Sequence, residues 1–441
     1  MRFRSLLLTL LFALPAPPVA AQATDAVAPA ATATASGELP PVDVEALEAE
    51  RAARRNLERN RPSARVGRYL RAAAEAIEND EPEKAQELLA KLQAGRLNPY
   101  DLAQVYQVTA FAAYGAGDQA GAIEAFQKVI EQDIIPVKDE IRIRFSIAQL
   151  YAGLEQWKPA IAALREWFRY VPSPDPLAYY LLAIAYFQLE QHDLAIVNAE
   201  TAVDLAPMPR EGWLQLLAAL YVQREDYQKA TPVLEELVLR FPKKLYWVQL
   251  SLIYGARENY RHSLAVQQMA YAQELLTEDK ELRRLARSYL HAEIPYPAAQ
   301  VLEKGLADGA IEPDAEAYEL LANSWIAARE YDKALAPLER GAELSDDGEL
   351  FVRLGQVHLQ REQWSQAAQM LHKAVEKGEL KNEGNALLLL GISYFNEEQV
   401  GQARSYFARA LKHDETRPQA ERWLKHIDEA AAETDNGAGP T

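Results

Sequence analysis

The sequence contains no cysteine. Disulfide bonds, cysteine metal sites and a cysteine nucleophile are therefore excluded. Basic residues are also in deficit, because 64 acidic side chains outnumber 47 basic ones and leave a formal net charge of −17. A general nucleic-acid-binding protein needs a basic surface, so this balance argues against that class and favours basic protein partners.

The sequence also lacks the short motifs that carry catalysis. HExxH, GxSxG, GxxxxGK[ST] and GxGxxG are all missing, and the seven histidines are scattered along the chain. Carboxylates are abundant, but no pair of them stands out from a solvated background. The sequence therefore predicts that the protein is not an enzyme and that it has no cofactor or metal site.

Long apolar stretches are missing except near the N-terminus. Arg2 and Arg4 precede a short apolar stretch, Leu6–Leu14, and Ala21-Gln22-Ala23 then fits the small-x-small cleavage rule. This order is typical of a secretory signal peptide, and the stretch is too short to cross a bilayer as a stable helix. We expect residues 1–23 to be removed, which takes the net charge from −17 to −19, and the mature chain to be periplasmic. An uncleaved anchor or simple disorder is the alternative.

Two segments of different composition follow. Residues 24–45 are rich in Ala, Thr and Pro, which predicts a disordered linker. Residues 46–62 combine good helix formers with Glu and Arg, which predicts a charged helix. Eight arginines lie between Arg51 and Arg71 in this otherwise acidic chain. Either they lie on a solvated helix that leads into the next domain, or the Arg51–Arg71 segment contacts an anionic membrane surface or an acidic partner.

An internal repeat dominates the rest of the chain. Between Tyr179 and Pro242, a pattern of large, small and aromatic residues recurs with each element 35 residues after its counterpart. Self-similarity of this kind predicts an array of helix–turn–helix units. The two matching lines are Tyr179, Leu182-Ala183, Tyr186, Ala195, Ala199, Ala202, Pro207 and Leu214, Leu217-Ala218, Tyr221, Ala230, Leu234, Leu237, Pro242.

Two small residues mark each unit. One, here called the anchor residue, recurs every 33 to 38 residues, and the other lies twelve positions before it. A bulky side chain at either position would push two packed helices apart, so both are predicted at the seam of a helix pair. The anchor residues are Ala85, Ala122, Ala160, Ala195, Ala230, Ser263, Ala298, Ala334, Ala367 and Ala403. The earlier residues are Ala73, Ala110, Ala148, Ala183, Ala218, Ser251, Ala286, Ala322, Gly355 and Gly391.

These offsets give the domain organisation. Apolar residues lie at helical spacing around each anchor residue, so every unit is predicted to contain two amphipathic helices. The fold class is therefore all-α, a solenoid of about ten helix pairs over residues 63–415. Residues 416–432 are predicted to form a helix that caps the last pair, and residues 433–441 a disordered tail.

The repeat pattern resembles the tetratricopeptide repeat (TPR) family over residues 63–415. The central part is similar to the periplasmic TPR proteins that accompany TonB–ExbB–ExbD energy-transduction systems. That similarity rests on the stretches Tyr246–Leu250, Ile294–Ala299, Val301–Leu306 and Asn323–Trp325. It implies an accessory protein of outer-membrane transport rather than an enzyme.

The same resemblance predicts a binding groove. In TPR proteins the first helix of each unit lines the concave face, and the corresponding positions here are Phe111, Tyr114, Phe145, Tyr180, Ile184 and Phe187. Aromatic side chains in such a groove suit a cationic proline-rich segment or an amphipathic helix. The alternative is that several of these side chains only pack between helices.

A later unit offers a cationic strip instead. Lys280, Arg283 and Arg287 lie on one helical face by their spacing, and such a strip suits a carboxylate terminus or acidic side chains. The alternative is that they pair with the neighbouring Glu278, Asp279 and Glu281.

Together these features predict a non-catalytic periplasmic scaffold that holds a segment of a TonB-type complex. A scaffold for cell-wall synthesis, polysaccharide export or outer-membrane assembly is the alternative.

Overall fold

The computed structural model describes residues 40–57, 63–79, 81–93 and 95–437. This part of the chain contains 22 helices, α2 to α23, and no strand, which confirms the predicted all-α solenoid. The predicted signal peptide and most of the predicted linker lie outside the described residues. The chain divides into two compact units, Met1–Pro209 and Arg210–Thr441, which are described separately.

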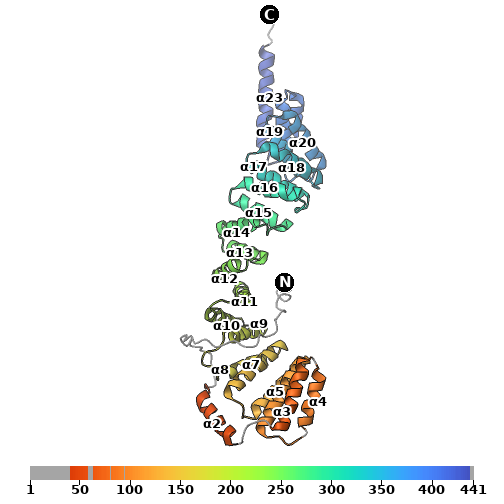
Figure 1. The fold of residues 1–441 in the computed structure, drawn as a ribbon. Coiled ribbons are helices and arrows are strands. Elements are labelled where there is room, and N and C mark those ends of the chain that lie inside the picture. Colours follow the sequence, from red (N-terminus) through yellow and green to blue (C-terminus); the bar gives the residue numbers. More distant parts are fainter. Residues whose placement is uncertain (1–39, 58–62, 80, 94, 438–441) are drawn as a thin grey trace. The chain divides into compact units, whose positions relative to one another are not determined.

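Unit 1 contains one single helix followed by four antiparallel helix pairs (Figure 1). The single helix is α2 (Val44–Leu57). The paired helices are α3 (Ala64–Glu78) with α4 (Pro82–Gln93), α5 (Pro99–Gly115) with α6 (Gln119–Glu131), α7 (Val137–Gly153) with α8 (Trp157–Phe168), and α9 (Pro176–Gln188) with α10 (His192–Leu205).

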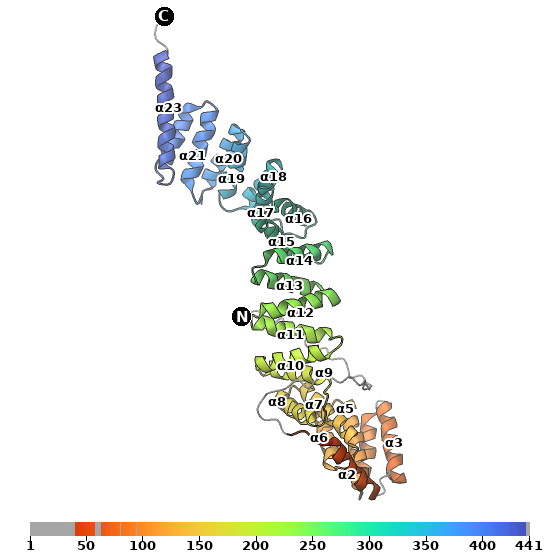
Figure 2. The same cartoon turned by 90° about the vertical axis from the view of Figure 1, so that its left-hand side faces the viewer.

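Unit 2 contains six pairs and a final helix (Figures 1 and 2). The paired helices are α11 (Glu211–Gln223) with α12 (Tyr227–Arg240), α13 (Lys244–Ala256) with α14 (Tyr260–Ala272), α15 (Asp279–His291) with α16 (Pro295–Ala307), α17 (Ala315–Ala327) with α18 (Tyr331–Leu344), α19 (Glu349–Gln360) with α20 (Trp364–Lys377), and α21 (Glu383–Asn396) with α22 (Val400–Ala410). The final helix is α23 (Arg417–Gly437). Within each unit, the second helix of a pair packs against the first helix of the next pair.

The seams of the pairs are formed by the small residues that the sequence pattern identifies. Nine of the ten anchor residues are alanines with no exposed surface, and Ser263 is also buried. At Gly391, an added Cβ would lie 2.5 Å from the ring of Phe407, so even alanine does not fit there without movement. Ser263 donates a hydrogen bond of 2.7 Å to the carbonyl of Ser251, the small residue opposite it. The anchor rule is therefore a packing rule, because it fixes how closely two helices approach.

From α5–α6 onward, the turn within each pair contains a residue in the left-handed backbone region. In the described turns this residue is Gly117 once, but most of the others are glutamates. Those glutamates are Glu155, Glu190, Glu225, Glu258, Glu293, Glu362 and Glu398, with φ between 56° and 63°. Glycine is the usual residue there because it has no Cβ to clash, so sequence rules based on glycine miss these turns.

The last pair is covered by α23. Trp423 stacks on Phe407 with ring centroids 5.4 Å apart, and Ala420 and Ile427 are buried beside it. A terminal helix of this kind shields the apolar face that the final repeat would otherwise expose. The helix continues to Gly437, so residues 433–437 of the predicted disordered tail are helical; the remaining four lie outside the described residues.

Candidate protein-binding surfaces

The most exposed of the predicted groove residues lie on α5. Phe111 and Tyr114, one helical turn apart, are 50% and 44% exposed. The Phe111 ring also meets Phe126 of α6 edge-on, with centroids 5.6 Å apart, so its orientation is fixed while one face stays open. We call these two side chains the α5 face.

The other predicted groove residues are half-buried. Phe145 of α7 lies against Trp167 of α8, with ring centroids 4.9 Å apart. Phe187 of α9 contacts the ring of His192, and Ile184 and Tyr180 lie on the same helix, one turn and two turns earlier respectively. α5 therefore presents open aromatic surface, whereas α7 uses its aromatic side chain for packing. The binding groove itself stays a prediction.

The predicted cationic strip on α15 is wrong for its central member. Arg283 is only 6% exposed. Its guanidinium donates to Asp279 (2.6 Å), to Asp314 (3.0 Å) and to the carbonyl of Glu312 (3.1 Å). Those interactions raise the pKa of Arg283, although burial alone would lower it. Arg283 therefore joins two successive pairs and does not face a ligand.

The outer members of the strip differ from Arg283. Arg287 is half-exposed and forms an ion pair of 2.5 Å with Glu316 of α17. Lys280 is exposed. The alternative interpretation, in which the strip pairs with the neighbouring acids, holds for only one of the three acids. Asp279 pairs with Arg283, whereas Glu278 and Glu281 pair with Lys244 of α13. A carboxylate-binding strip of three cations is therefore not present on α15.

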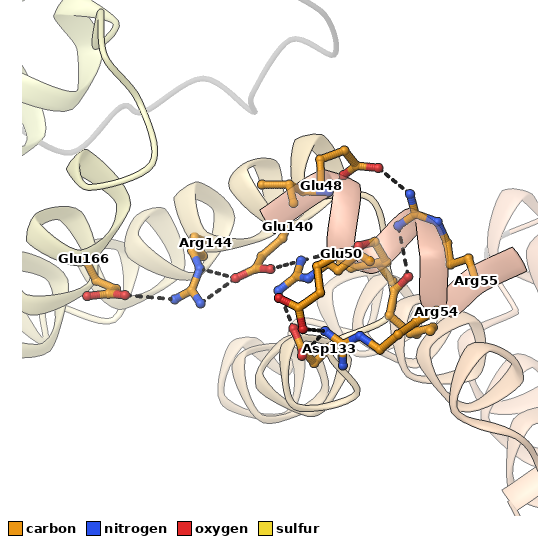
Figure 3. A network of polar contacts seen from close by, with 12 residues as sticks. Glu48, Glu50, Arg54, Arg55, Asp133, Glu140, Arg144 and Glu166 are labelled. Atoms are coloured by element: carbon orange, nitrogen blue, oxygen red, sulfur yellow. Dashed lines mark hydrogen bonds and ion pairs between the residues drawn. The ribbon is translucent and has the colours of Figure 1, made fainter. Parts of the chain in front are cut away.

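A third surface, which the sequence pattern does not indicate, lies where α6 passes into α7 (Figure 3). Arg51 of α2 is 4% exposed and inserts its guanidinium here. It forms ion pairs with Asp133 (2.5 Å) and with Glu140, and donates to the carbonyl of Ile135 at 3.4 Å. We call Asp133, Glu140 and the carbonyls of Ile134 and Ile135 the arginine seat.

Two further arginines of α2 reach the same seat. Arg54 pairs with Asp133 at 2.6 Å, and Arg55 donates to the carbonyl of Ile134 at 3.3 Å. Arg55 also pairs with Glu48 of its own helix. Because Arg51, Arg54 and Arg55 are spaced i, i+3 and i+4, they project from one face of α2.

α2 also completes the N-terminus of α7. The residue before α7 is Pro136, whose side chain cannot accept a hydrogen bond, so no local side chain caps the helix. Instead, Glu48 accepts a hydrogen bond of 2.7 Å from the backbone N–H of Val137. A carboxylate at this position satisfies one of the free N–H groups and interacts favourably with the helix dipole.

The contacts continue into an alternating row of charges (Figure 3). From the seat, Glu140 pairs with Arg144 at 2.5 Å, and Arg144 lies 3.8 Å from Glu166 of α8. Glu166 in turn pairs with Arg169 at 2.9 Å. The Arg169 side chain donates to the carbonyl of Pro40, and its own carbonyl accepts from the N–H of Val42. Residues 40–57 are thus held at both ends.

Two acids at the junction between α2 and the repeats, Asp133 and Glu48 of α2 itself, have lowered pKa values. Burial would raise the pKa of Asp133, but the hydrogen bond from Arg54 and the charge of Arg51 outweigh it and lower that pKa. Burial likewise opposes the hydrogen bond from Val137 and the contact with Arg55, which together lower the pKa of Glu48. Both acids are therefore ionised at neutral pH, and their charges hold α2 in place.

These contacts correct both interpretations of the arginine-rich segment. Arg51 is buried rather than solvated, and Arg51, Arg54 and Arg55 face the protein's own acids rather than an external anion. Arg65, Arg68 and Arg71 of α3 are exposed. The helix α2 begins at Val44, two residues before the predicted start of the charged helix at residue 46. The only local hint of its docking is the uncapped start of α7.

A shallow cleft adjoins the row of charges. It lies among α6, α7 and α8, has a volume of about 440 Å³, and contains Arg144 and Glu166 in its wall. Ile130 and Ile147 form part of its apolar lining. Arg144 and Glu166 already pair with each other, and Glu131 adds a further carboxylate to the lining of the cleft.

Among the described residues, no helix has the length and apolar character needed to cross a membrane. Within the same residues, no group of three or more His, Asp or Glu side chains is arranged to hold a metal ion.

Comparisons with known proteins give the family of one repeat. Residues 177–207, which cover α9 and α10, match the tetratricopeptide repeat model. No curated protein matches the sequence. The pair α9–α10 is therefore a tetratricopeptide repeat, and proteins built from such repeats are generally non-catalytic scaffolds that bind protein partners.

Solved structures show similar helix pairs. A tetratricopeptide repeat protein from Parabacteroides merdae is 15% identical, with a TM-score of 0.33, and the match covers 68% of this chain and 98% of that one. MamA from Desulfovibrio magneticus is 23% identical, with a TM-score of 0.34 and coverage of 40% and 96%. The structure of Naa15/Naa10 bound to HypK-THB is 13% identical, with a TM-score of 0.40, and the match covers 84% of this chain and 61% of that one. At these values the similarity concerns the fold alone.

Proposed function

We propose that the protein is a non-catalytic periplasmic scaffold that binds a cationic, proline-rich protein segment through the α5 face. The observation that carries the proposal is the open aromatic surface of Phe111 and Tyr114 in a chain of net charge −17. Proline-rich segments are already extended, so docking them on aromatic side chains costs little conformational entropy. Basic side chains in the segment are attracted by the acidic surface.

The finer assignment is an accessory of a TonB-type energy-transduction system. It is supported by the resemblance in the Tyr246–Leu250 and Ile294–Leu306 stretches and by the signal-peptide pattern of residues 1–23. Crosslinking in intact cells, followed by mass spectrometry, tests it directly. Recovery of inner-membrane energy-transduction proteins supports the assignment. Recovery of cell-wall, polysaccharide-export or outer-membrane assembly proteins instead would assign the scaffold to one of those systems.

The α5 face is tested with a labelled peptide of alternating lysine and proline. We expect saturable binding to the full chain, weakened at least about tenfold by Phe111→Ala with Tyr114→Ala, because truncation removes the aromatic anchors. Val197→Ala, which truncates an exposed apolar side chain on α10, is the matched control. Equal affinity of the two variants for the peptide would remove the α5 face from the proposal.

Export is tested separately. If the signal peptide is cleaved after Ala23, N-terminal sequencing of the protein from a periplasmic extract must begin at Thr24. Retention of the first 23 residues, or recovery only from the cytoplasmic fraction, would contradict the location.

A further inference from the structure

We propose that the arginine seat is a second binding site, which recognises a helix carrying arginines at i, i+3 and i+4, and that α2 is its exchangeable resident. A partner helix with the same arginine pattern replaces α2 there. The site is distinct from the α5 face, because its contacts come from the α6–α7 connection and the start of α7.

The seat is built for guanidinium groups. Asp133 and Glu140 supply two carboxylates to Arg51, and the carbonyls of Ile134 and Ile135 accept from Arg55 and Arg51. A planar guanidinium has five N–H donors and can serve several acceptors at once, whereas a lysine ammonium is a point charge. Asp133 adopts a left-handed conformation, with φ of 50°, in the short connection between the two helices.

Charge rather than apolar burial holds α2 in the seat. Of the α2 residues whose side chains are described, Arg51 is the only buried one, and the rest are half-buried or exposed. A helix held in this way contributes little hydrophobic free energy to its own docking. Apart from the buried ion pair of Arg51 with Glu140, the charged contacts of α2 are partly exposed, and such contacts exchange readily with water and with other charges. An element held in this way belongs to the less stable part of a fold.

The seat remains partly satisfied when α2 leaves. Glu140, which is 1% exposed, keeps its ion pair with Arg144 of the same helix. Asp133 is 46% exposed in its side chain even with α2 present, so water reaches it. Departure of α2 therefore leaves no isolated buried charge, and the empty seat can persist until another arginine-bearing helix binds.

The chemistry of the occupant follows from the contacts that α2 makes. Arg51 enters deepest, Arg54 covers Asp133 from outside, and Arg55 reaches the carbonyl of Ile134. An incoming helix needs these three arginines on one face, and an acid three residues before the first, as Glu48 is, to cap α7. The net charge of −17 favours the approach of such a basic segment.

The experiment uses a labelled synthetic peptide with the sequence of residues 40–57 and two variants of the full chain. In the first variant, Arg51→Ala, Arg54→Ala and Arg55→Ala release α2 and empty the seat. In the second, Arg65→Ala, Arg68→Ala and Arg71→Ala remove three exposed arginines of α3 and leave α2 docked. The two variants carry the same change in charge, so they differ only in whether the seat is open.

We expect saturable binding of the peptide to the first variant, and binding at least about tenfold weaker to the second and to the unaltered chain, where α2 competes. Arg51→Ala in the peptide is expected to weaken binding by a further factor of about ten or more. Equal binding to all three chains, no binding to a folded first variant, or indifference to Arg51→Ala in the peptide would overturn the proposal.

A second measurement covers the case in which the first variant does not fold. On the unaltered chain, excess peptide must accelerate hydrogen exchange of the α2 amides and leave those of α13 unchanged; unaltered α2 exchange overturns the proposal. Sedimentation at rising protein concentration tests whether α2 of a second copy of the chain occupies the seat. Dimers that disappear when Arg51 is replaced would show this and would contradict a separate partner. The lysine–proline peptide of the α5 face plays no part in these measurements, so the two proposals fail independently.

Discussion

Two buried arginines, one in each unit, solve the same physical problem with different parts of the chain. Arg51 of unit 1 and Arg283 of unit 2 are 4% and 6% exposed. Each guanidinium donates hydrogen bonds to two carboxylates and to one backbone carbonyl. The chemistry is alike because a buried guanidinium is tolerated only when its N–H groups find acceptors and its charge finds partners.

The difference lies in where the partners come from. Arg283 takes Asp279 from four residues earlier and Asp314 from 31 residues later, which is the next pair of the repeat. Arg51 takes Asp133 from 82 residues later and Glu140 from 89 residues later, and its helix belongs to no pair. The arginine of unit 2 is therefore part of the repeat architecture, whereas that of unit 1 fastens an added segment onto it.

The comparison predicts its largest effect for Arg283→Ala. Loss of this arginine leaves Asp279 and Asp314 facing each other without the intervening positive charge, and we expect the free energy of unfolding of unit 2 to fall by about 2 to 3 kcal/mol. Urea denaturation, together with hydrogen exchange in α15 to α17, measures it. Arg284→Ala, at the exposed neighbouring position, is the control. Equal losses for the two variants would show that Arg283 does not join the pairs.

Arg51→Ala is predicted to act locally instead. α2 loses the only buried side chain among those described in this helix, so its amides are expected to exchange about tenfold faster or more, while the free energy of unfolding of the repeats changes by less than about 1 kcal/mol. Hydrogen exchange read by mass spectrometry separates the two readouts. Arg54→Ala, which removes a more exposed contact to Asp133, should have a smaller effect on α2. A loss of repeat stability comparable with that of Arg283→Ala would erase the distinction between the two arginines.

Acid is predicted to release α2. The pKa values of Asp133 and Glu48 are lowered in the folded protein, from ordinary values of 3.8 and 4.5. Their stabilising contribution is therefore complete above those ordinary values and is lost as the pH falls through the lower, folded values.

Because the chain has no cysteine, labels on Ala49→Cys and Lys138→Cys can report the separation of α2 from α7 by energy transfer. We expect a constant distance from pH 7 to about 5 and an increase of several-fold in the released fraction below about 4. Release that begins near pH 7 would point to groups other than these two acids.

High salt is predicted to have the smallest effect on α2, but to separate the behaviour of α2 from that of α15 most clearly. At 1 M salt the screening length is about 3 Å, so the half-exposed pair of Arg54 and Asp133 weakens, and we expect the released fraction of α2 to rise about threefold. Arg283 lies on α15, which is also held by buried apolar side chains at its seams, so hydrogen exchange of the α15 amides should stay constant. An equal response of α2 and α15 to salt would mean that both are held by charge alone.

The sequence predicted the helix pairs well because their determinants are local and periodic. Ala195 and Ala230 lie 35 residues apart and are both fully buried, since each must let two neighbouring helices approach closely. The left-handed glutamates, such as Glu225, escaped prediction because no residue type marks them as glycine does. Their conformation follows from the helix pair that closes around them.

The candidate surfaces were less predictable for a related reason. Phe111 and Phe145 follow the same repeat pattern, yet Phe145 is turned toward a tryptophan of its own pair and Phe111 stays half-exposed. The pattern specifies the helical face on which a residue lies, but the neighbouring side chains determine how much of it remains open.

The amino-acid sequence alone determined that this chain forms stacked pairs of helices, because the spacing of small and apolar residues restricts each pair to one way of packing. Only the tertiary structure decided which charges are buried and which are open. An ion pair depends on distance in space and on exclusion of water. Arg51 and Asp133 are 82 positions apart in the sequence, and the order of acids and arginines along the chain does not show that the two side chains meet.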